Sequence, residues 1–240
     1  MASNRPKRIV LFGRTGVGKS SVGNTLLGKD YFKTKCTASS VTQVCETAEE
    51  ILESGQPLQI VDTPGIFDAE GKNMFSEVQN VFDLLKPGPH AILIVYMPQR
   101  CSRVEDVLDL RKLFGNDMFL EYTILIINRK SEIINPSIPN VREFIKNSDS
   151  VELQQLYEQC GKRVVAVENY DVWEKRKLDA EEIMREIETL DVNYIHHCFD
   201  LVHENIELKA EQLKRQEQIR ELERENKELK YKNNTSCNML

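Results

Sequence analysis

A glycine-rich segment near the start of the chain has the residue types and the spacing that phosphate binding requires. It matches the pattern GxxxxGK[ST] and continues into a second serine: Gly13, Arg14, Thr15, Gly16, Val17, Gly18, Lys19, Ser20 and Ser21. Glycines let backbone N–H groups curl around a β-phosphate, because a side chain there would clash. Lys19 can reach the β- and γ-phosphate oxygens, and the Ser20 hydroxyl can bind Mg²⁺. The segment therefore predicts a site for the phosphates of a nucleotide.

A second short motif, Asp62-Thr63-Pro64-Gly65, follows the apolar run Leu58-Gln59-Ile60-Val61. A carboxylate at the end of a strand can hold Mg²⁺ through a water, so Asp62 joins Ser20 as a predicted metal ligand. The N–H of Gly65 can bind a γ-phosphate, and hydrolysis would break that contact and release the loop beyond it. Downstream of a phosphate-binding segment, this motif indicates a GTPase of the switch type.

The elements that must position these motifs can be read from the apolar runs. Runs of this kind suit strands of a sheet that is covered on both faces, and we expect them at Arg8–Phe12, Pro57–Val61, Ala91–Met97, Tyr122–Ile127 and Arg163–Val167. Helical patterns lie between them, at Ser20–Leu27 ending at Gly28, Phe75–Leu85, Val104–Phe114 and Val151–Cys160. Alternating strands and helices predict an α/β fold with a mostly parallel central sheet flanked by helices.

Two local features refine this expected fold. The segments Val41–Leu52 and Pro57–Val61 flank Glu53-Ser54-Gly55-Gln56, a predicted hairpin turn that makes the sheet mixed. Asp149, with Glu152 three residues later, forms a predicted capping box for the helix that begins near Val151.

Composition excludes several classes of protein. The chain has 240 residues and a net charge of −6, whereas domains that bind nucleic acid by counterion release are usually basic on one face. The longest apolar run, Ala91–Met97, is too short to span a bilayer. The first residues form no apolar signal segment, and the six cysteines have no CxxC spacing. We therefore expect a cytoplasmic protein with reduced thiols.

The chain from Leu178 to about Lys232 contains no proline or glycine, and its charges pair at helical spacing. We expect one long helix there, or two in line. Ile219, Leu222, Asn226 and Leu229 fit a short coiled-coil repeat, which is compatible with either self-association or a solvated terminal helix. We place a nucleotide-binding domain at residues 5–195 and a helical extension with a flexible tail at 196–240. Cys237 loosely fits a prenylation box, the one feature that suggests membrane association.

Several segments in a fixed order resemble one family. They are GRTGVGKSSVGNTLLG (13–28), SVTQVC (40–45), DTPGIFD (62–68), PGPHAILIV (87–95), LFG (113–115), INRKSE (127–132) and QCGKRVVAVEN (159–169). Over about residues 7 to 190 the chain is similar to the GIMAP group of immune-associated GTPases, also called the AIG-type domain. PGPHAILIV discriminates best, because nucleotide chemistry does not require it. The resemblance implies a P-loop GTPase domain that binds GTP or GDP with Mg²⁺ and has a role in immunity.

The resemblance also implies further site residues. Thr34 matches a family Ser/Thr near the nucleotide, and Thr42 matches the threonine of SVT that reaches Mg²⁺ or the γ-phosphate. Asn169 matches a family asparagine that contacts the base, while its neighbour Glu168 replaces another asparagine.

The loop expected to recognise guanine departs from the usual [NT]KxD, in which the Asp accepts from guanine N1–H and N2–H. One register of Asn128-Arg129-Lys130-Ser131-Glu132 places Ser131 at the Asp position. The other aligns Arg129-Lys130-Ser131-Glu132 with the family's RKED and gives the carboxylate to Glu132. The stem of Arg129 or Lys130 can lie on the purine face in either register.

Catalysis is the least complete part of the predicted site. Ile66, Phe67 and Asp68 follow Gly65, without the glutamine that orients water in Ras-type enzymes. Family members that hydrolyse GTP are thought to use an arginine supplied across a dimer, and Arg100 matches it, with Arg103 as a rival. We expect a switch protein that forms a homodimer or oligomer with GTP and hydrolyses it slowly. The alternatives are a GTP-binding scaffold with little hydrolysis and an ATP-using P-loop enzyme.

Overall fold

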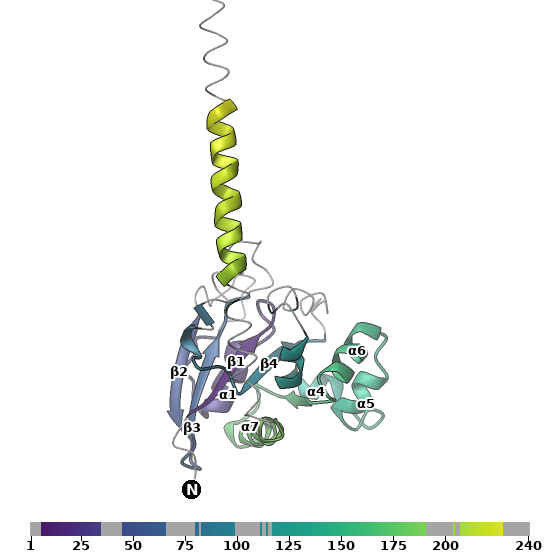
Figure 1. Cartoon of the computed structure of the whole chain (residues 1–240). Coiled ribbons are helices and arrows are strands. Elements are labelled where there is room, and N and C mark those ends of the chain that lie inside the picture. The colour runs from purple at the N-terminus through teal and green to yellow at the C-terminus, as the bar shows by residue number, and fades with distance from the viewer. Residues whose placement is uncertain are drawn as a thin grey trace, which may run out of the picture.

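A six-stranded sheet forms the centre of the computed structural model, which describes residues 6–34, 45–65, 80–81, 83–98, 111, 114, 117–190, 204 and 207–227 (Figure 1). The strands are ordered β2-β3-β1-β4-β5-β6. Their bounds are β1 Lys7–Phe12, β2 Glu46–Ile51, β3 Pro57–Asp62, β4 Ala91–Tyr96, β5 Thr123–Asn128 and β6 Val164–Val167. All neighbouring pairs are parallel except β2 with β3, which confirms the predicted mostly parallel sheet with one hairpin.

Helices cover both faces of this sheet. They are α1 Lys19–Leu27, α4 Lys130–Ile133, α5 Val141–Lys146, α6 Val151–Gln159 and α7 Trp173–Glu188, with a 3₁₀ helix, η2, at Met118–Tyr122. Ile9 and Leu11 of β1 pack in a cluster with side chains of α1 and α7. Val10 and Phe12 point the other way, into a cluster with side chains of α5 and α6. Burial on both faces explains why the central strands are continuously apolar.

Helix α1 ends as the sequence predicts. Gly28 adopts a left-handed conformation with φ 69° and donates its N–H to the Thr25 carbonyl, a C-terminal cap that glycine tolerates without a steric penalty. The predicted helices Phe75–Leu85 and Val104–Phe114 fall mostly outside the described residues. Residues 80, 81, 83 and 84, and residues 111 and 114, are helical.

The predicted cap of α6 is wrong by one residue. Ser150, not Asp149, is the N-cap, and its Oγ accepts a hydrogen bond of 3.2 Å from the N–H of Leu153. Leu153 and Leu156 must face the core, which fixes the start of the helix at Val151 and puts the serine in the capping position.

The chain from Leu178 onward, expected to form one long helix or two in line, contains two helices among its described residues. The first, α7, begins earlier, at Trp173, and ends at Glu188. Its Ile183 and Ile187, with Leu190 just beyond it, are buried in the cluster against the sheet. The second covers residues 207–227 and stands away from the α/β domain, not in line with α7 (Figure 1). The division at residue 195 stays a prediction.

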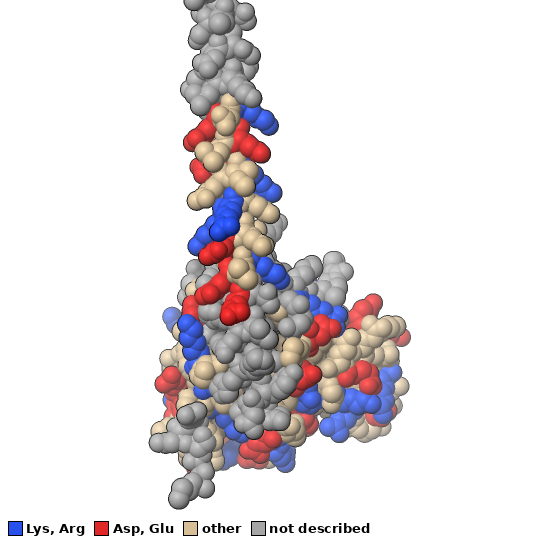
Figure 2. Space-filling model, viewed as in Figure 1, with Lys and Arg blue, Asp and Glu red and all other residues tan. Residues whose placement is uncertain are grey.

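The helix of residues 207–227 carries acidic and basic side chains along its length (Figure 2). Glu211 and Arg215 pair at 3.8 Å, one of the predicted spacings. Ile219 and Leu222 are more than half exposed, at 55% and 58%, and the coiled coil stays a prediction. Within the described part of the chain, no helix is both long and apolar enough to cross a membrane.

Candidate nucleotide-binding site

The loop between β1 and α1 has a backbone that only glycine adopts readily at three positions. Gly13, Gly16 and Gly18 have φ of 148°, 78° and 97°. A Cβ on Gly13 would lie 2.6 Å from the Val95 carbonyl oxygen. Gly18 is the N-cap of α1 and offers no side-chain cap, so the first N–H groups of the helix are available to an anion. This is the arrangement that a phosphate site needs.

Lys19 is held across the same loop. Its Nζ donates to the carbonyl oxygens of Gly13 and Arg14, both at 2.9 Å, and the residue is only 7% exposed. These contacts hold the ammonium at the loop, where it can bind phosphate oxygens.

Two of the three predicted metal ligands, Ser20 and Asp62, meet beside this loop. Ser20 Oγ donates to Asp62 Oδ2 at 2.6 Å. Asp62 ends β3 and lies opposite Leu11 of β1, whose carbonyl accepts from Thr63 Oγ1 at 2.6 Å. A hydroxyl and a carboxylate are hard oxygen donors of the kind that Mg²⁺ prefers. The residues fit this ion, and their role as its ligands stays a prediction.

The remaining switch residues are placed only in part. Gly65 is half-buried and Thr34 is exposed, and their contacts with a nucleotide stay predictions. Thr42, Arg100 and Arg103 lie outside the described residues.

Asn128 links the phosphate loop to Asn169, the residue predicted to contact the base. The sequence did not assign Asn128 to the site. It is the last residue of β5 and is 1% exposed. Its Nδ2 donates to the carbonyl of Val17 at 2.9 Å, and its Oδ1 accepts from Asn169 Nδ2 at 3.1 Å. A signal was present, because the register that begins at Asn128 puts an amide at the first position of [NT]KxD.

Asn169 continues this network into two helices. Its Oδ1 accepts from Thr25 Oγ1 of α1 at 2.8 Å, and that hydroxyl accepts from Arg176 Nε of α7 at 3.0 Å. Arg176 also stacks on Trp173, 3.6 Å from the ring centroid. Burial lowers the pKa of the Arg176 guanidinium, the nearby Asp30 opposes that shift, and the group stays protonated. The predicted base-contacting residue is therefore fixed by α1 and α7 together.

The loop after β5 is held by three pairs of side chains. Arg129, with φ 60°, bonds through Nη1 to Glu132 Oε1 at 2.7 Å. Lys130 Nζ donates to Asp179 Oδ1 of α7 at 2.7 Å. Ser131 binds Glu168, in the loop after β6, through both its N–H and its hydroxyl. All four predicted residues of this loop lie at the same edge of the sheet as Asn169, as the prediction requires.

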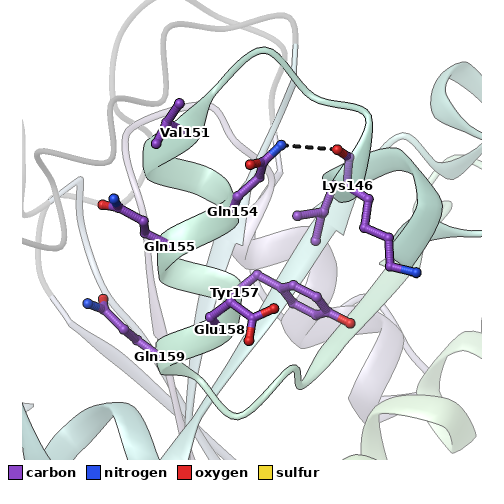
Figure 3. Close-up of a pocket in the computed structure, with 8 residues that line it drawn as sticks. Lys146, Val151, Gln154, Gln155, Tyr157, Glu158 and Gln159 are labelled. Carbon is purple, nitrogen blue, oxygen red and sulfur yellow. Dashed lines mark hydrogen bonds between the residues drawn. The ribbon is translucent and has the colours of Figure 1, made fainter.

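A separate groove lies between α5 and α6 (Figure 3). Gln154 Nε2 donates to the Lys146 carbonyl across it at 3.0 Å. It contains none of the predicted site residues; its lining is Ile145, Lys146, Val151, Gln154, Gln155, Tyr157, Glu158 and Gln159. The groove therefore has no part in the nucleotide site.

The fold and the clustered motifs define a P-loop GTPase domain. Solved structures agree: Toc33 from Arabidopsis thaliana in complex with GDP and Mg²⁺ matches with a TM-score of 0.57 at 17% identity, over 77% of this chain and 85% of that chain. Era from Aquifex aeolicus matches with a TM-score of 0.52 at 17% identity, over 77% of this chain and 56% of that one. At these identities the likeness concerns the fold alone.

The chain belongs to the AIG1 family, whose model matches residues 7–218. This confirms the family predicted from the sequence. Among curated proteins of Arabidopsis thaliana, immune-associated nucleotide-binding protein 10 is 30% identical over 89% of this chain and 47% of its own length. Protein 12 of the same series is 32% identical over 89% of this chain and 56% of its own length. The chain thus spans about half the length of these two relatives.

Proposed function

We propose that this protein is a guanine-nucleotide-dependent switch that binds GTP and GDP with Mg²⁺ and hydrolyses GTP slowly. The observation that carries the proposal is the convergence of Lys19, Ser20 and Asp62 at the loop between β1 and α1. Lys19 binds the phosphate oxygens, and the helix N-terminus adds its free N–H groups. Bound Mg²⁺ would supply positive charge to the β- and γ-phosphates.

The switching step follows from where Asp62 and Gly65 lie. Asp62 is fixed at the end of β3 by the sheet, and Gly65 is three residues beyond it. An N–H contact from Gly65 to a γ-phosphate would order the loop with GTP and release it with GDP. We extend the proposal to a homodimer that forms with GTP, in a cytoplasmic protein. Dimerisation is described as important for the GTPase activity of the structural relative Toc33.

A second candidate function is a scaffold that binds GTP with little hydrolysis. The residues Ile66, Phe67 and Asp68 favour it, because none is a glutamine that could orient the attacking water. Single-turnover hydrolysis, measured across a range of protein concentrations, separates the two candidates. A rate that stays near that of free GTP at every concentration would favour the scaffold.

Calorimetric titration tests nucleotide binding. We expect GDP and GTP to bind at least about tenfold tighter than ADP and ATP, or about 1.4 kcal/mol. Lys19→Ala should abolish detectable binding without unfolding the chain. Lys29→Ala is the matched control, since Lys29 follows the same helix but pairs with Glu50 at the surface. Unchanged GDP affinity in Lys19→Ala would overturn the phosphate-site assignment, and equal affinity for ATP would overturn the guanine preference alone.

A further inference from the structure

The carboxylate of Glu168 is fixed against the loop that follows β5. Its Oε2 accepts from the Ser131 N–H at 3.1 Å and from the Ser131 hydroxyl at 2.5 Å. The backbone N–H of Glu168 donates to Asp179 Oδ2 at 2.8 Å. Main chain and side chain are thus both held in place. Among the described residues, Oε1 of Glu168 makes no hydrogen bond, so this oxygen is available to a ligand.

The contact between Ser131 and Glu168 matters because Ser131 stands where this loop usually carries the carboxylate that binds guanine. Asn128 bridges β5 to the phosphate loop through Val17, which places it at the first position of [NT]KxD. Ser131, three residues later, then occupies the position of the usual carboxylate. The loop after β5 therefore presents a hydroxyl, and the loop after β6 presents the acid that this hydroxyl binds.

Glu132, the carboxylate suggested by the other register, is paired within its own loop. Its Oε1 accepts from Arg129 Nη1 at 2.7 Å, and both side chains are about one-third exposed. This pair joins two residues of the same loop, and a partly exposed ion pair of this kind holds a carboxylate only weakly. Glu168 is instead held from a second loop, the one after β5, and its neighbour Asn169 belongs to the network that fixes the site.

We propose that Glu168 selects guanine, accepting from the base N1–H and N2–H, and that Ser131 positions it. This inference rests on the proposed function, because it concerns the base of the same nucleotide. A carboxylate complements the two adjacent donors of guanine. Adenine presents an unprotonated N1 and a C–H at that edge, so a carboxylate there leaves charge without a partner.

The test exchanges the carboxylate for an amide and the base for xanthine, which has an oxo group where guanine has its 2-amino group. In Glu168→Gln, the amide oxygen still accepts from N1–H, while the amide NH₂ now donates to the xanthine oxygen. The wild-type chain should prefer GDP to xanthosine diphosphate. We expect Glu168→Gln to lose at least about tenfold in GDP affinity and to bind xanthosine diphosphate more tightly than GDP.

Two further variants separate base selection from structural damage. Glu132→Gln tests the rival register, and if Glu168 holds the base this variant keeps the preference for GDP. Combining Ser131→Asp with Glu168→Ser returns the carboxylate to the loop after β5, and should restore the preference that Glu168→Ser alone loses. Tighter binding of xanthosine diphosphate is a gain that a destabilised site cannot produce.

The outcomes distinguish this inference from the function it depends on. If wild type prefers GDP and Glu168→Gln behaves in the same way, the assignment to Glu168 is overturned and nucleotide binding stands. If Glu132→Gln reverses the preference instead, Glu132 holds the base. If the folded wild-type chain binds neither GDP nor GTP, the proposed function fails, and the assignment fails with it.

Discussion

Two glycines flank helix α1, and their surroundings differ although their backbones are alike. Gly18 precedes the helix with φ 97°, and Gly28 follows it with φ 69°. A Cβ on Gly18 would lie 2.2 Å from Nδ2 of Asn128, whereas a Cβ on Gly28 would meet nothing within 4 Å. Gly18 is thus required both for its conformation and for the close approach of Asn128 to the phosphate loop.

These two glycines give a matched pair of substitutions. Each alanine variant should lose about 1–2 kcal/mol of stability through left-handed strain. Only Gly18→Ala also displaces Asn128 and breaks its hydrogen bond to Val17. We expect GDP affinity to fall at least about tenfold in Gly18→Ala and to change by no more than about twofold in Gly28→Ala. Calorimetric titration alongside urea unfolding checks both, and equal GDP affinities would contradict the role given to Asn128.

Helix α7 acts as a clamp on both loops that flank the predicted base site. Asp179, which is 5% exposed, accepts from Lys130 Nζ through Oδ1 and from the Glu168 N–H through Oδ2. One turn earlier, Arg176 donates to Thr25 of α1. A single helix thus couples the loop after β5, the loop after β6 and the helix that begins at the phosphates.

Removing this clamp should reduce both stability and nucleotide affinity. In Asp179→Ala, the Glu168 N–H loses its acceptor and Lys130 is left with Glu182, whose Oε2 lies 4.0 Å from its Nζ, which costs about 2–3 kcal/mol of unfolding free energy. Glu181→Ala is the control, because Glu181 is an exposed residue of the same helix and should change stability by no more than about 0.5 kcal/mol. Urea unfolding measures the difference, and equal midpoints for the two variants would contradict the clamp.

The same elements show what the sequence can and cannot predict. The central strands were predictable because burial on both faces leaves an apolar run, and the phosphate loop because its glycines and Lys19 serve one chemistry. The start of α7 was missed because Arg176 and Asp179 face the site, and such polar positions look like a solvated surface. Glu168 was seen only as a departure from the family, since its partner Ser131 is 37 residues away.

At the scale of the whole molecule, the described residues of the predicted site offer a cation for phosphates and two oxygen ligands for a metal. Under the proposed function, Lys19 would neutralise phosphate charge, and Ser20 and Asp62 would hold Mg²⁺. All three residues would act on charge that the phosphates and the metal already carry before the reaction begins. Charge that develops late in phosphoryl transfer needs a further cation, and an arginine supplied by a partner raises the rate about 10³–10⁵-fold.

Arg100 is predicted to be that arginine, and hydrolysis should then depend on protein concentration. It lies outside the described residues, four positions after β4 ends at Tyr96. Since β4 runs parallel to β1 beside the phosphate loop, the chain leaves the sheet at the edge where ligands bind. Arg100→Ala should change GDP affinity by no more than about twofold and lower the hydrolysis rate at high protein concentration to the rate of the dilute wild type.

Arg103→Ala is the control for this prediction, because Arg103 is the rival position in the same segment. Phosphate release, measured per protein molecule across a dilution series, gives both readouts. The wild-type specific rate should rise with concentration as dimers form, and Arg103→Ala should follow it. A slow Arg103→Ala beside an unaffected Arg100→Ala would move the role to Arg103. A wild-type specific rate that stays flat with concentration would contradict an arginine acting across a dimer, because a residue acting within its own chain needs no second copy.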